Sequence, residues 1–153
     1  MPAIELNHSG LEDRWLYCDG SPELLFTENE TNAQRLWGAE NPTPYVKDGI
    51  NDFIVHGAKH SVNPEHFGTK AAAHYELTVE AGNSTVLRLR LTDQKQNAKS
   101  AFESFDRVFR LRKEEADDFY ATVIPGGLSS DSQNVMCQEI LRQEVQQPSA
   151  VLA

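Results

Sequence analysis

Four carboxylates in one stretch rich in Asn, Asp, Gly and Pro are the first candidates for chemistry: Glu28, Glu30, Asp48 and Asp52. Glycoside hydrolysis needs two carboxyl groups placed on either side of a glycosidic bond, and a pair such as Glu30 and Asp48 could supply them. No spacing rule singles out a pair, because acidic residues are common throughout the chain. We favour the alternative, in which these groups cap turns and accept hydrogen bonds from backbone amides.

Five histidines are the next residues that could bind a ligand: His8, His56, His60, His66 and His74. His56 and His60 are four positions apart, so they would face each other if that stretch were helical, and imidazole is a zinc ligand. Gly57 lies between them, however, and the glutamate of a zinc-protease motif is absent. Ordinary polar or partly buried histidines are therefore the better interpretation.

The remaining motifs also fall short of a catalytic or cofactor site. Residues 68–70 are Gly-Thr-Lys, but they lack the first glycine of a phosphate loop, and the candidate strand follows them instead of preceding them. The sequence has no G-x-S-x-G motif, and no histidine neighbours Cys18. We therefore predict no catalytic, cofactor-binding or metal-binding residue in this chain.

Several aromatic side chains could stack on a sugar ring: Trp15, Tyr17, Trp37, Tyr45 and Phe67. Packing in a core is the expected role for most of them. Trp37 and Tyr45 flank a long loop and not a strand, so they are the two positions at which sugar contact is the interpretation to examine.

The composition describes a foldable chain that is lean in core-forming side chains. Hydrophobic residues make up 39%, charged residues 24%, and the mean hydropathy is −0.52. A net charge of −9 argues against nucleic acid as a partner, because binding it needs a basic face, and it disfavours an anionic membrane surface. No apolar run approaches the roughly 18 residues of a spanning helix. We expect no signal peptide, and we interpret Cys18 and Cys137 as reduced thiols. Both expectations lead us to expect a cytoplasmic location.

Strand and loop patterns fill the chain before residue 98. Alternating apolar and polar residues predict a strand at 3–8, and the segments 14–18 and 23–27, separated by the turn signal Asp19-Gly20-Ser21-Pro22, are two further strand candidates. Residues 28–69 are expected to form a long loop with short helical turns near 31–36 and 50–55. Residues 70–80 and 84–92 are predicted to pair as one hairpin through the turn Ala81-Gly82-Asn83.

The hydrophobic period then becomes helical. Ser100 and Glu103 match a capping box, and phenylalanines follow at helical spacing, which predicts one helix over 100–123. This phenylalanine stripe either packs on the chain's own sheet or binds a partner. A second capping box, Ser130 with Gln133, predicts another helix that ends at Pro148.

The order of elements predicts an α+β fold. We expect a portion of an antiparallel β-sandwich followed by two linker helices, because the strands do not alternate with helices as in a parallel fold. The expected domains are a partial sandwich over 1–98 with the loop insertion at 28–69, a helical linker over 99–148, and a tail over 149–153.

Long ordered motifs in the loop region resemble glycoside hydrolase family sixty-three, the large cytosolic glucosidase-like proteins. The first is the run Pro-Glu-Leu-Leu-Phe-Thr-Glu-Asn-Glu-Thr-Asn at 22–32. The others are Pro-Tyr-Val-Lys-Asp-Gly at 44–49, Val-Asn-Pro at 62–64, Gly-Thr-Lys-Ala-Ala-Ala at 68–73, Glu-Ala-Asp-Asp-Phe-Tyr at 115–120, and Leu-Ser at 128–129. The resemblance runs from about Arg14 to Gln138.

In that family a β-sandwich precedes a helical linker and an (α/α)6 barrel that carries the catalytic acid and base. The resemblance therefore implies an accessory β-domain and linker of a glycoside hydrolase acting in carbohydrate metabolism, with the barrel, on the same or a separate chain, as its partner. It provides no barrel residue to carry over, so we expect no complete active site. Two alternatives stay open: a carbohydrate-binding module, and an interaction protein that uses the 100–123 helix.

Overall fold

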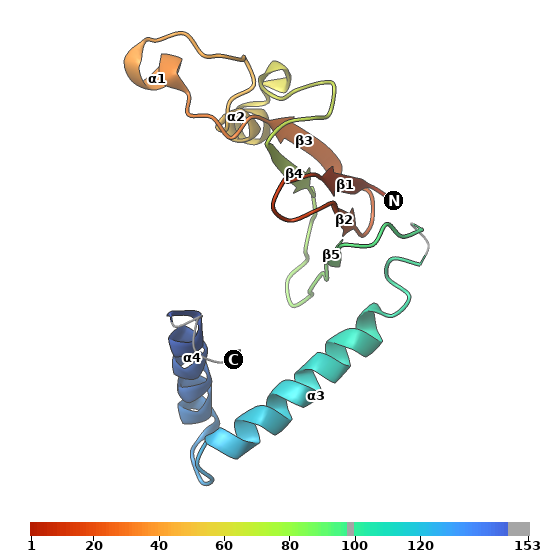
Figure 1. Ribbon diagram of the computed structural model, residues 1–153, viewed down its shortest axis with the longest axis vertical. Coiled ribbons are helices and arrows are strands. Elements are labelled where there is room, and N and C mark those ends of the chain that lie inside the picture. Colours follow the sequence, from red (N-terminus) through yellow and green to blue (C-terminus); the bar gives the residue numbers. More distant parts are fainter. Residues whose placement is uncertain (98–99, 147–153) are drawn as a thin grey trace. The chain divides into compact units, whose positions relative to one another are not determined.

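The computed structural model describes residues 1–97 and 100–146, and within these it contains four α-helices and two antiparallel sheets (Figure 1). The chain divides into two compact units, Met1–Glu103 and Ser104–Ala153. Helices and antiparallel strands are thus both present, as the α+β prediction requires. The domain boundary predicted at 98/99, Pro148 and the predicted tail over 149–153 all lie outside the described residues.

The first sheet has three strands in the order β1-β2-β5, namely Ala3–Leu6, Arg14–Cys18 and Leu89–Thr92. One face of this sheet is covered by the segment that follows β5. There the Tyr17 hydroxyl donates to the Gln96 carbonyl at 3.0 Å, and Arg90 Nη1 donates to the carbonyl of the fully buried Ala101 at 2.8 Å.

The second sheet pairs β3, Glu23–Thr27, with β4, Lys70–His74. Helix α2, Gly49–His56, packs on this ribbon (Figure 1). Leu25, Ile50 and Val62 form the buried core there, with Phe53 and Ala72 packed against them. This core is small because the strands are short, and it anchors the loop region that carries the candidate site.

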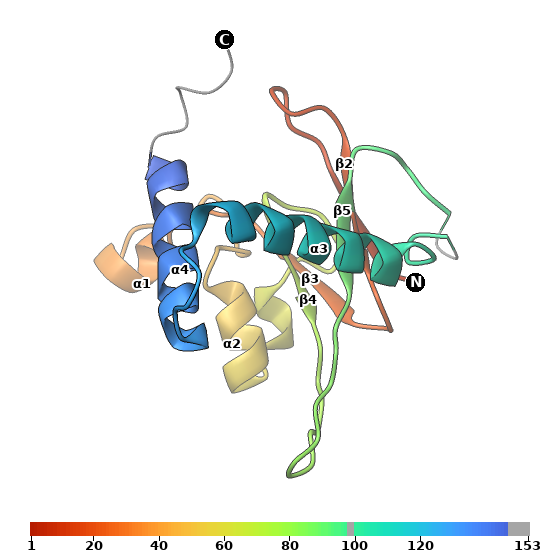
Figure 2. The same cartoon turned by 90° about the horizontal axis from the view of Figure 1, so that it is seen from below.

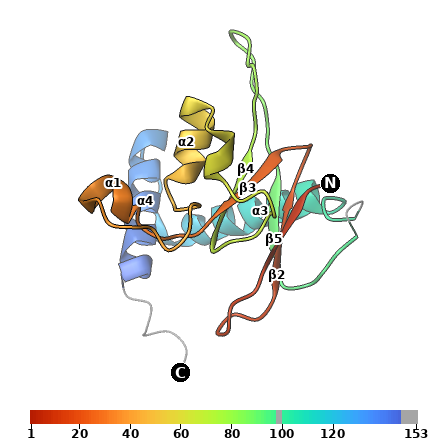
Figure 3. The same ribbon diagram turned by 90° about the horizontal axis from the view of Figure 1, so that it is seen from above.

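The hairpin predicted over 70–80 and 84–92 is wrong in extent and pairing. Strand β4 ends at His74 and β5 begins at Leu89, and the two strands belong to different sheets. Residues 75–88 form an extended arm that projects from the sheets (Figures 2 and 3), with its turn where predicted, since Asn83 N donates to the Glu80 carbonyl. Alternation marks extended backbone, but it does not determine which strand becomes the partner.

The two helices of the second unit are α3, Phe105–Val123, and α4, Ser130–Gln146. The capping box predicted at Ser100 and Glu103 is wrong: residues 100–104 form turns, and the Ser100 hydroxyl donates to the Asn97 carbonyl instead. Helix α4 is capped by Ser129, whose Oγ accepts from Ser132 N at 3.2 Å, one residue before the predicted cap.

No described helix combines the length and apolar character that crossing a membrane would require. No residue of α3 is buried. Phe109 is 67% exposed and Phe119 is 50% exposed, whereas Phe105 is partly buried.

Candidate functional site

The loop over 28–69 is an ordered structure tied to the end of β3. It contains helix α1, Ala33–Trp37, helix α2 and a 3-10 turn, Lys59–Ser61. Backbone hydrogen bonds run from Glu28 N to the Tyr45 carbonyl at 2.8 Å and from Lys47 N to the Glu30 carbonyl at 3.0 Å. The loop therefore holds its side chains in defined positions, as a functional or interfacial loop must.

Close packing at two glycines explains how the loop approaches β3. A Cβ on Gly49 would lie 2.1 Å from the Ser61 carbonyl oxygen, and one on Gly68 would lie 2.4 Å from the Thr27 carbonyl oxygen. In both cases the nearest atom belongs to the backbone, so the chain itself would have to move to make room for a side chain. Glycine is thus required at these two positions by backbone approach, which is one of its specific uses.

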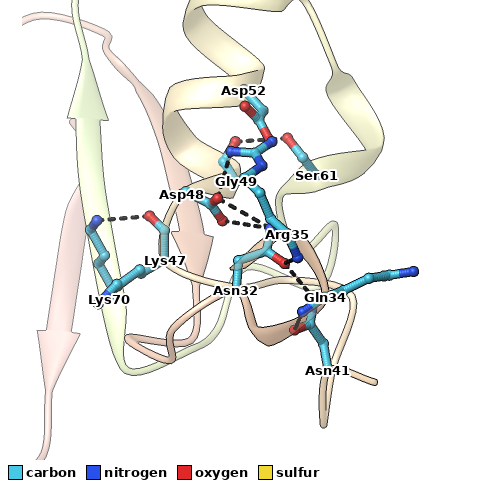
Figure 4. A network of polar contacts seen from close by, with 10 residues as sticks. All are labelled: Asn32, Gln34, Arg35, Asn41, Lys47, Asp48, Gly49, Asp52, Ser61 and Lys70. Atoms are coloured by element: carbon cyan, nitrogen blue, oxygen red, sulfur yellow. Dashed lines mark hydrogen bonds and ion pairs between the residues drawn. The ribbon is translucent and has the colours of Figure 1, made fainter. Parts of the chain in front are cut away.

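Arg35 lies at the centre of a polar network that joins α1 to α2 (Figure 4). Its Nη1 donates to Asp48 Oδ2 at 2.6 Å, and its Nη2 donates to Asp52 Oδ2 at 2.5 Å. Asn32 Nδ2 also donates to both oxygens of Asp48, at 3.2 and 3.1 Å. The hydrogen bond to Asp52 and the charges of both aspartates raise the pKa of Arg35. We call these four residues the Arg35 network.

The Arg35 network assigns Asp48 and Asp52 a structural role. Asp48 and Asp52 stand four residues apart around the first turn of α2, so they lie on one side of that helix. Both carboxylates accept hydrogen bonds from the same guanidinium, and Asp48 also accepts from Asn32, so these oxygens are used in contacts within the loop. The arrangement therefore favours the interpretation that these groups order the loop.

The other two candidate carboxylates lie elsewhere. Glu28 Oε2 accepts from the Thr69 hydroxyl at 2.6 Å, and Thr69 Oγ1 in turn accepts from Asn29 N at 2.8 Å. Glu30 contributes its backbone carbonyl to the loop, and its side chain is exposed. The structure thus brings Asp48 and Asp52 together through Arg35, and it places Glu28 in a separate cluster.

Two surface hollows flank this loop. One, of about 330 Å³, is lined by seven residues and is called the Tyr45 hollow: Glu28, Thr43, Tyr45, Asn63, Pro64, Glu65 and Phe67. The other, of about 460 Å³, is lined by polar residues that include Asn32, Asp48, Asp52 and His60. Thr43 contributes to both linings.

The aromatic residues separate into a packed group and an exposed group. Tyr17 is buried and Trp15 is partly buried, whereas Trp37 is 70% exposed and Phe67 is 58% exposed. Tyr45 is half-buried in the wall of its hollow. The sequence analysis named Trp37 and Tyr45 as positions where sugar contact should be examined, and it assigned Phe67 to core packing. Phe67 is exposed instead.

The structure separates His56 from His60, because α2 ends at Gly57 in a left-handed conformation with φ of 66°. Across the described ranges 1–97 and 100–146, no group of three or more His, Cys, Asp or Glu side chains could hold a metal ion. Both cysteines are free thiols, as predicted.

Sequence reasoning missed two residues that organise this region: Arg35 and Thr69. The sequence did contain a signal for Arg35. Two aspartates four positions apart at the start of a helix lie on the same side of it, and a nearby cation would reduce their mutual repulsion. Thr69 had no such signal, because its partners Glu28 and Asn29 lie 41 and 40 residues away in the chain.

The chain is 36% identical over 132 residues to a protein of Saccharomyces cerevisiae, the uncharacterized protein YMR196W. The aligned region is 78% of this chain but 12% of the yeast protein. The chain therefore spans a small part of the length of this relative. It matches no protein-family model. No solved structure matches it either.

Proposed function

We propose that this chain is the accessory β-domain and helical linker portion of a larger glycoside-hydrolase-like protein in the cytoplasm. Its two antiparallel sheets would belong to a β-sandwich, and the chain would pack on an (α/α)6 catalytic barrel of the same or another chain. Its contribution would be to support the barrel and shape the rim of its pocket. The residues that break the glycosidic bond would be the barrel's.

The observation that carries this proposal concerns β5 and the end of the arm before it: the apolar side chains there are exposed, whereas a charged side chain on the opposite face is partly buried. Leu87, Leu89 and Leu91 are 46%, 49% and 62% exposed, whereas Arg90 on the opposite face is partly buried. We call these three leucines the leucine face. A strand normally turns its apolar face toward a core. An exposed apolar face is typical of a surface that packs on another unit.

Two further observations support the same role. The Arg35 network engages Asp48 and Asp52 in structural contacts, so these two carboxylates are not left free as an acid and base pair. The aligned part of the yeast relative is 12% of its length, so most of that protein lies outside the aligned region and leaves room for a domain of barrel size.

Binding to the rest of the yeast relative tests the packing role. The region of that protein outside the alignment is produced as a separate chain, and its affinity for this chain is measured by calorimetry. Leu89→Ser with Leu91→Ser is expected to weaken the complex by about tenfold or more, because central apolar contacts dominate interfaces. Leu11→Ser, at another exposed leucine of the same unit, is the matched control and should leave the affinity unchanged.

Hydrolysis of aryl α-glucosides and α-mannosides tests the non-catalytic assignment. The chain alone is expected to release no aryl alcohol above the uncatalysed rate. Clear turnover that is lost on Glu30→Gln or Asp48→Asn would contradict the assignment, as would an absence of any complex with the remainder of the relative.

The exposed phenylalanines of α3 favour a second candidate, an interaction protein that uses the 100–123 helix. Phe109 and Phe119 are 67% and 50% exposed, and the Phe105 and Phe109 rings stack with centroids 6.3 Å apart. Phe109→Ser should then abolish partner binding while the double leucine variant retains it, which is the reverse of the outcome expected above.

A further inference from the structure

We propose that α3 pairs with the α3 of a second copy of this chain and forms an antiparallel two-helix coiled coil. The proposal goes beyond the packing role and does not depend on it, because it rests on the side chains of α3 and not on the leucine face. Exposed apolar side chains, their spacing and the order of charges along α3 point to the same partner.

The apolar side chains of α3 are accessible to solvent. Phe109 is 67% exposed, Phe119 is 50% exposed and Val123 is 43% exposed, and no residue of the helix is buried. Exposed apolar side chains that gather on one element are typical of a surface that packs on another unit. A large part of the apolar surface of α3 is therefore available for a contact.

These side chains repeat at the spacing of a coiled-coil seam. Steps of four and three residues alternate along the helix, and they define six positions that we call the α3 seam: Phe105, Phe109, Arg112, Ala116, Phe119 and Val123. Such a repeat keeps the seam on one side of the helix, as positions a and d of a heptad do. The seam covers less than three heptads, so it would support a reversible pair.

The charged residues of α3 are sorted by sign. Between positions 107 and 118 four basic residues precede four acidic ones: Arg107, Arg110, Arg112, Lys113, Glu114, Glu115, Asp117 and Asp118. This order runs against the helix macrodipole, which favours acidic residues near the start and basic residues near the end. The ion pair of Lys113 with Asp117 at 2.7 Å also has the basic residue first, which stabilises a helix less than the reverse order. The isolated helix therefore gains little from this sorting.

A second copy in the opposite direction gains from the sorted charges. In a parallel pair the two basic halves would lie side by side, and so would the two acidic halves. In an antiparallel pair the basic half of each copy lies beside the acidic half of the other. The axes of packed helices are about 8–10 Å apart, which is close to the screening length of about 10 Å at 0.1 M salt, so part of the attraction persists. Helix α4 is a poorer match, because Arg142 is its one basic residue.

The apolar members of the α3 seam also fit their own copy in this direction. When Glu114, the midpoint of α3, lies at the same level in both copies, Phe109 of each copy faces Phe119 of the other. Phe105 then faces Val123. Each pairing occurs twice by symmetry, so four of the six layers of the seam are entirely apolar. These four layers would hold the pair together.

The two central layers pair Arg112 with Ala116 of the other copy. The small alanine side chain leaves room for the arginine stem, and the guanidinium can extend to solvent, where its Nη2 bonds Glu115 Oε1 at 2.7 Å. The Lys113 side chains of the two copies approach each other near the midpoint. Each is paired with its own Asp117 at 2.7 Å, which offsets their repulsion.

Sedimentation velocity on the full 153-residue chain tests the proposal. A monomer–dimer equilibrium is expected, with a dissociation constant on the order of 100 µM because the helix is short. Phe109→Ser should raise that constant at least about tenfold, since buried aromatic anchors dominate interfaces. Leu111→Ser is the matched control and should dimerise like the parent, because Leu111 is 40% exposed on the same helix but lies outside the seam. Serine and phenylalanine have similar helix propensities, and leucine has a higher one, so the control disturbs the helix at least as much.

Distances between spin labels establish the direction of the pair. A nitroxide is attached through Glu114→Cys or Ala121→Cys in the Cys137→Ser background, in which the remaining Cys18 is fully buried. Positions 114 and 121 are one heptad apart on the side of α3 away from the seam. In an antiparallel pair the labels at 114 lie level, whereas those at 121 are offset by about 20 Å along the axis. The distance measured at 121 should therefore be the longer one.

The proposal is overturned if the chain stays monomeric at concentrations tenfold above the expected dissociation constant. It is also overturned if Phe109→Ser dimerises like Leu111→Ser, or if the labels at 114 and 121 give equal distances, as a parallel pair would. A monomer whose Phe109 is needed to bind the remainder of the yeast relative would assign the α3 seam to that partner instead. A monomeric chain leaves the packing role intact, because that role is measured by complex formation through the leucine face.

Discussion

Thr27 carries a hydroxyl group in a fully buried position at the end of β3. Its Oγ1 has no hydrogen-bond partner in the part of the chain that the structure describes. A buried hydroxyl without a partner costs about 1–3 kcal/mol in mutational data. The backbone of Thr27 packs on Gly68 and its methyl group faces Gly49, so the residue matters to the loop through its shape.

Replacing this hydroxyl by a methyl group is expected to stabilise the fold. Thr27→Val keeps the shape and should raise the free energy of unfolding by about 1 kcal/mol. Thr69→Val is the matched comparison, because Thr69 Oγ1 bonds both Glu28 and Asn29 N, and it should lower that free energy by about 1 kcal/mol. Urea denaturation measures both. A destabilised Thr27→Val would mean that the hydroxyl is satisfied.

The two thiols differ in burial, so they should differ in reactivity. Burial raises the pKa of Cys18, with a hydrogen bond from Tyr75 acting in the opposite direction, whereas Cys137 is partly exposed. A raised pKa means less thiolate at mildly alkaline pH, and thiolate is the reactive form. Cys18 should react with a disulfide reagent at least about tenfold more slowly than Cys137 near pH 8. Cys137→Ser and Cys18→Ser assign the two phases, and equal rates would contradict the expectation.

At the scale of elements, α1 shows how tertiary contacts support a helix that cannot stand alone. It has five residues, far fewer than an isolated helix needs in water. Asn32 Oδ1 accepts from Arg35 N at 3.0 Å and caps its start. Arg35 then ties it to α2 through Asp48 and Asp52.

Loss of the Arg35 side-chain contacts should loosen α1. Arg35→Gln is expected to speed hydrogen exchange several-fold at the amides of Leu36 and Gly38, which close the helix. Arg112→Gln removes a surface ion pair with Glu115 on α3 and should leave those amides unchanged. Unaltered exchange in Arg35→Gln would show that capping by Asn32 alone holds the helix.

Leucines on the two sheets should differ in how much their substitution lowers the free energy of unfolding. Leu25 is 2% exposed in the core between β3 and α2, so Leu25→Ala should lower the free energy of unfolding by about 2–5 kcal/mol. Leu89 is 49% exposed, so Leu89→Thr should change it by less than about 0.5 kcal/mol. Chemical denaturation checks both values. A large loss in Leu89→Thr would mean that the leucine face is already covered in this chain.

At the scale of the whole molecule, the two units are expected to unfold separately. Both tryptophans, Trp15 and Trp37, belong to the unit Met1–Glu103, so tryptophan fluorescence reports on that unit. The far-UV signal at about 222 nm also includes α3 and α4, and no residue of α3 is buried. Helices without a packed face are marginal in water. The far-UV signal should therefore begin to fall at a lower temperature than the fluorescence, and coincident transitions would contradict this.

Local signals were sufficient for several elements. Strands over 14–18 and 23–27 were predicted with the bounds that the structure has, because the apolar runs and the turn signal at 19–22 are encoded in neighbouring residues. The short helices within 28–69 were also expected near their observed places. Turn-forming residues and helical periods act over a few positions, so a single sequence carries them.

The pairing of the strands and the contacts between distant side chains depended on tertiary structure. Strand β4 joins β3 and strand β5 joins β2, whereas the sequence pattern made them one hairpin, because alternation does not encode a partner. At the candidate site, the residues at 48 and 52 could be seen to share a helix face, but their cation lies 13 and 17 positions away at Arg35. The sequence by itself determined where the chain is extended or helical; only the fold decided which side chains meet, because those contacts join segments distant in the chain.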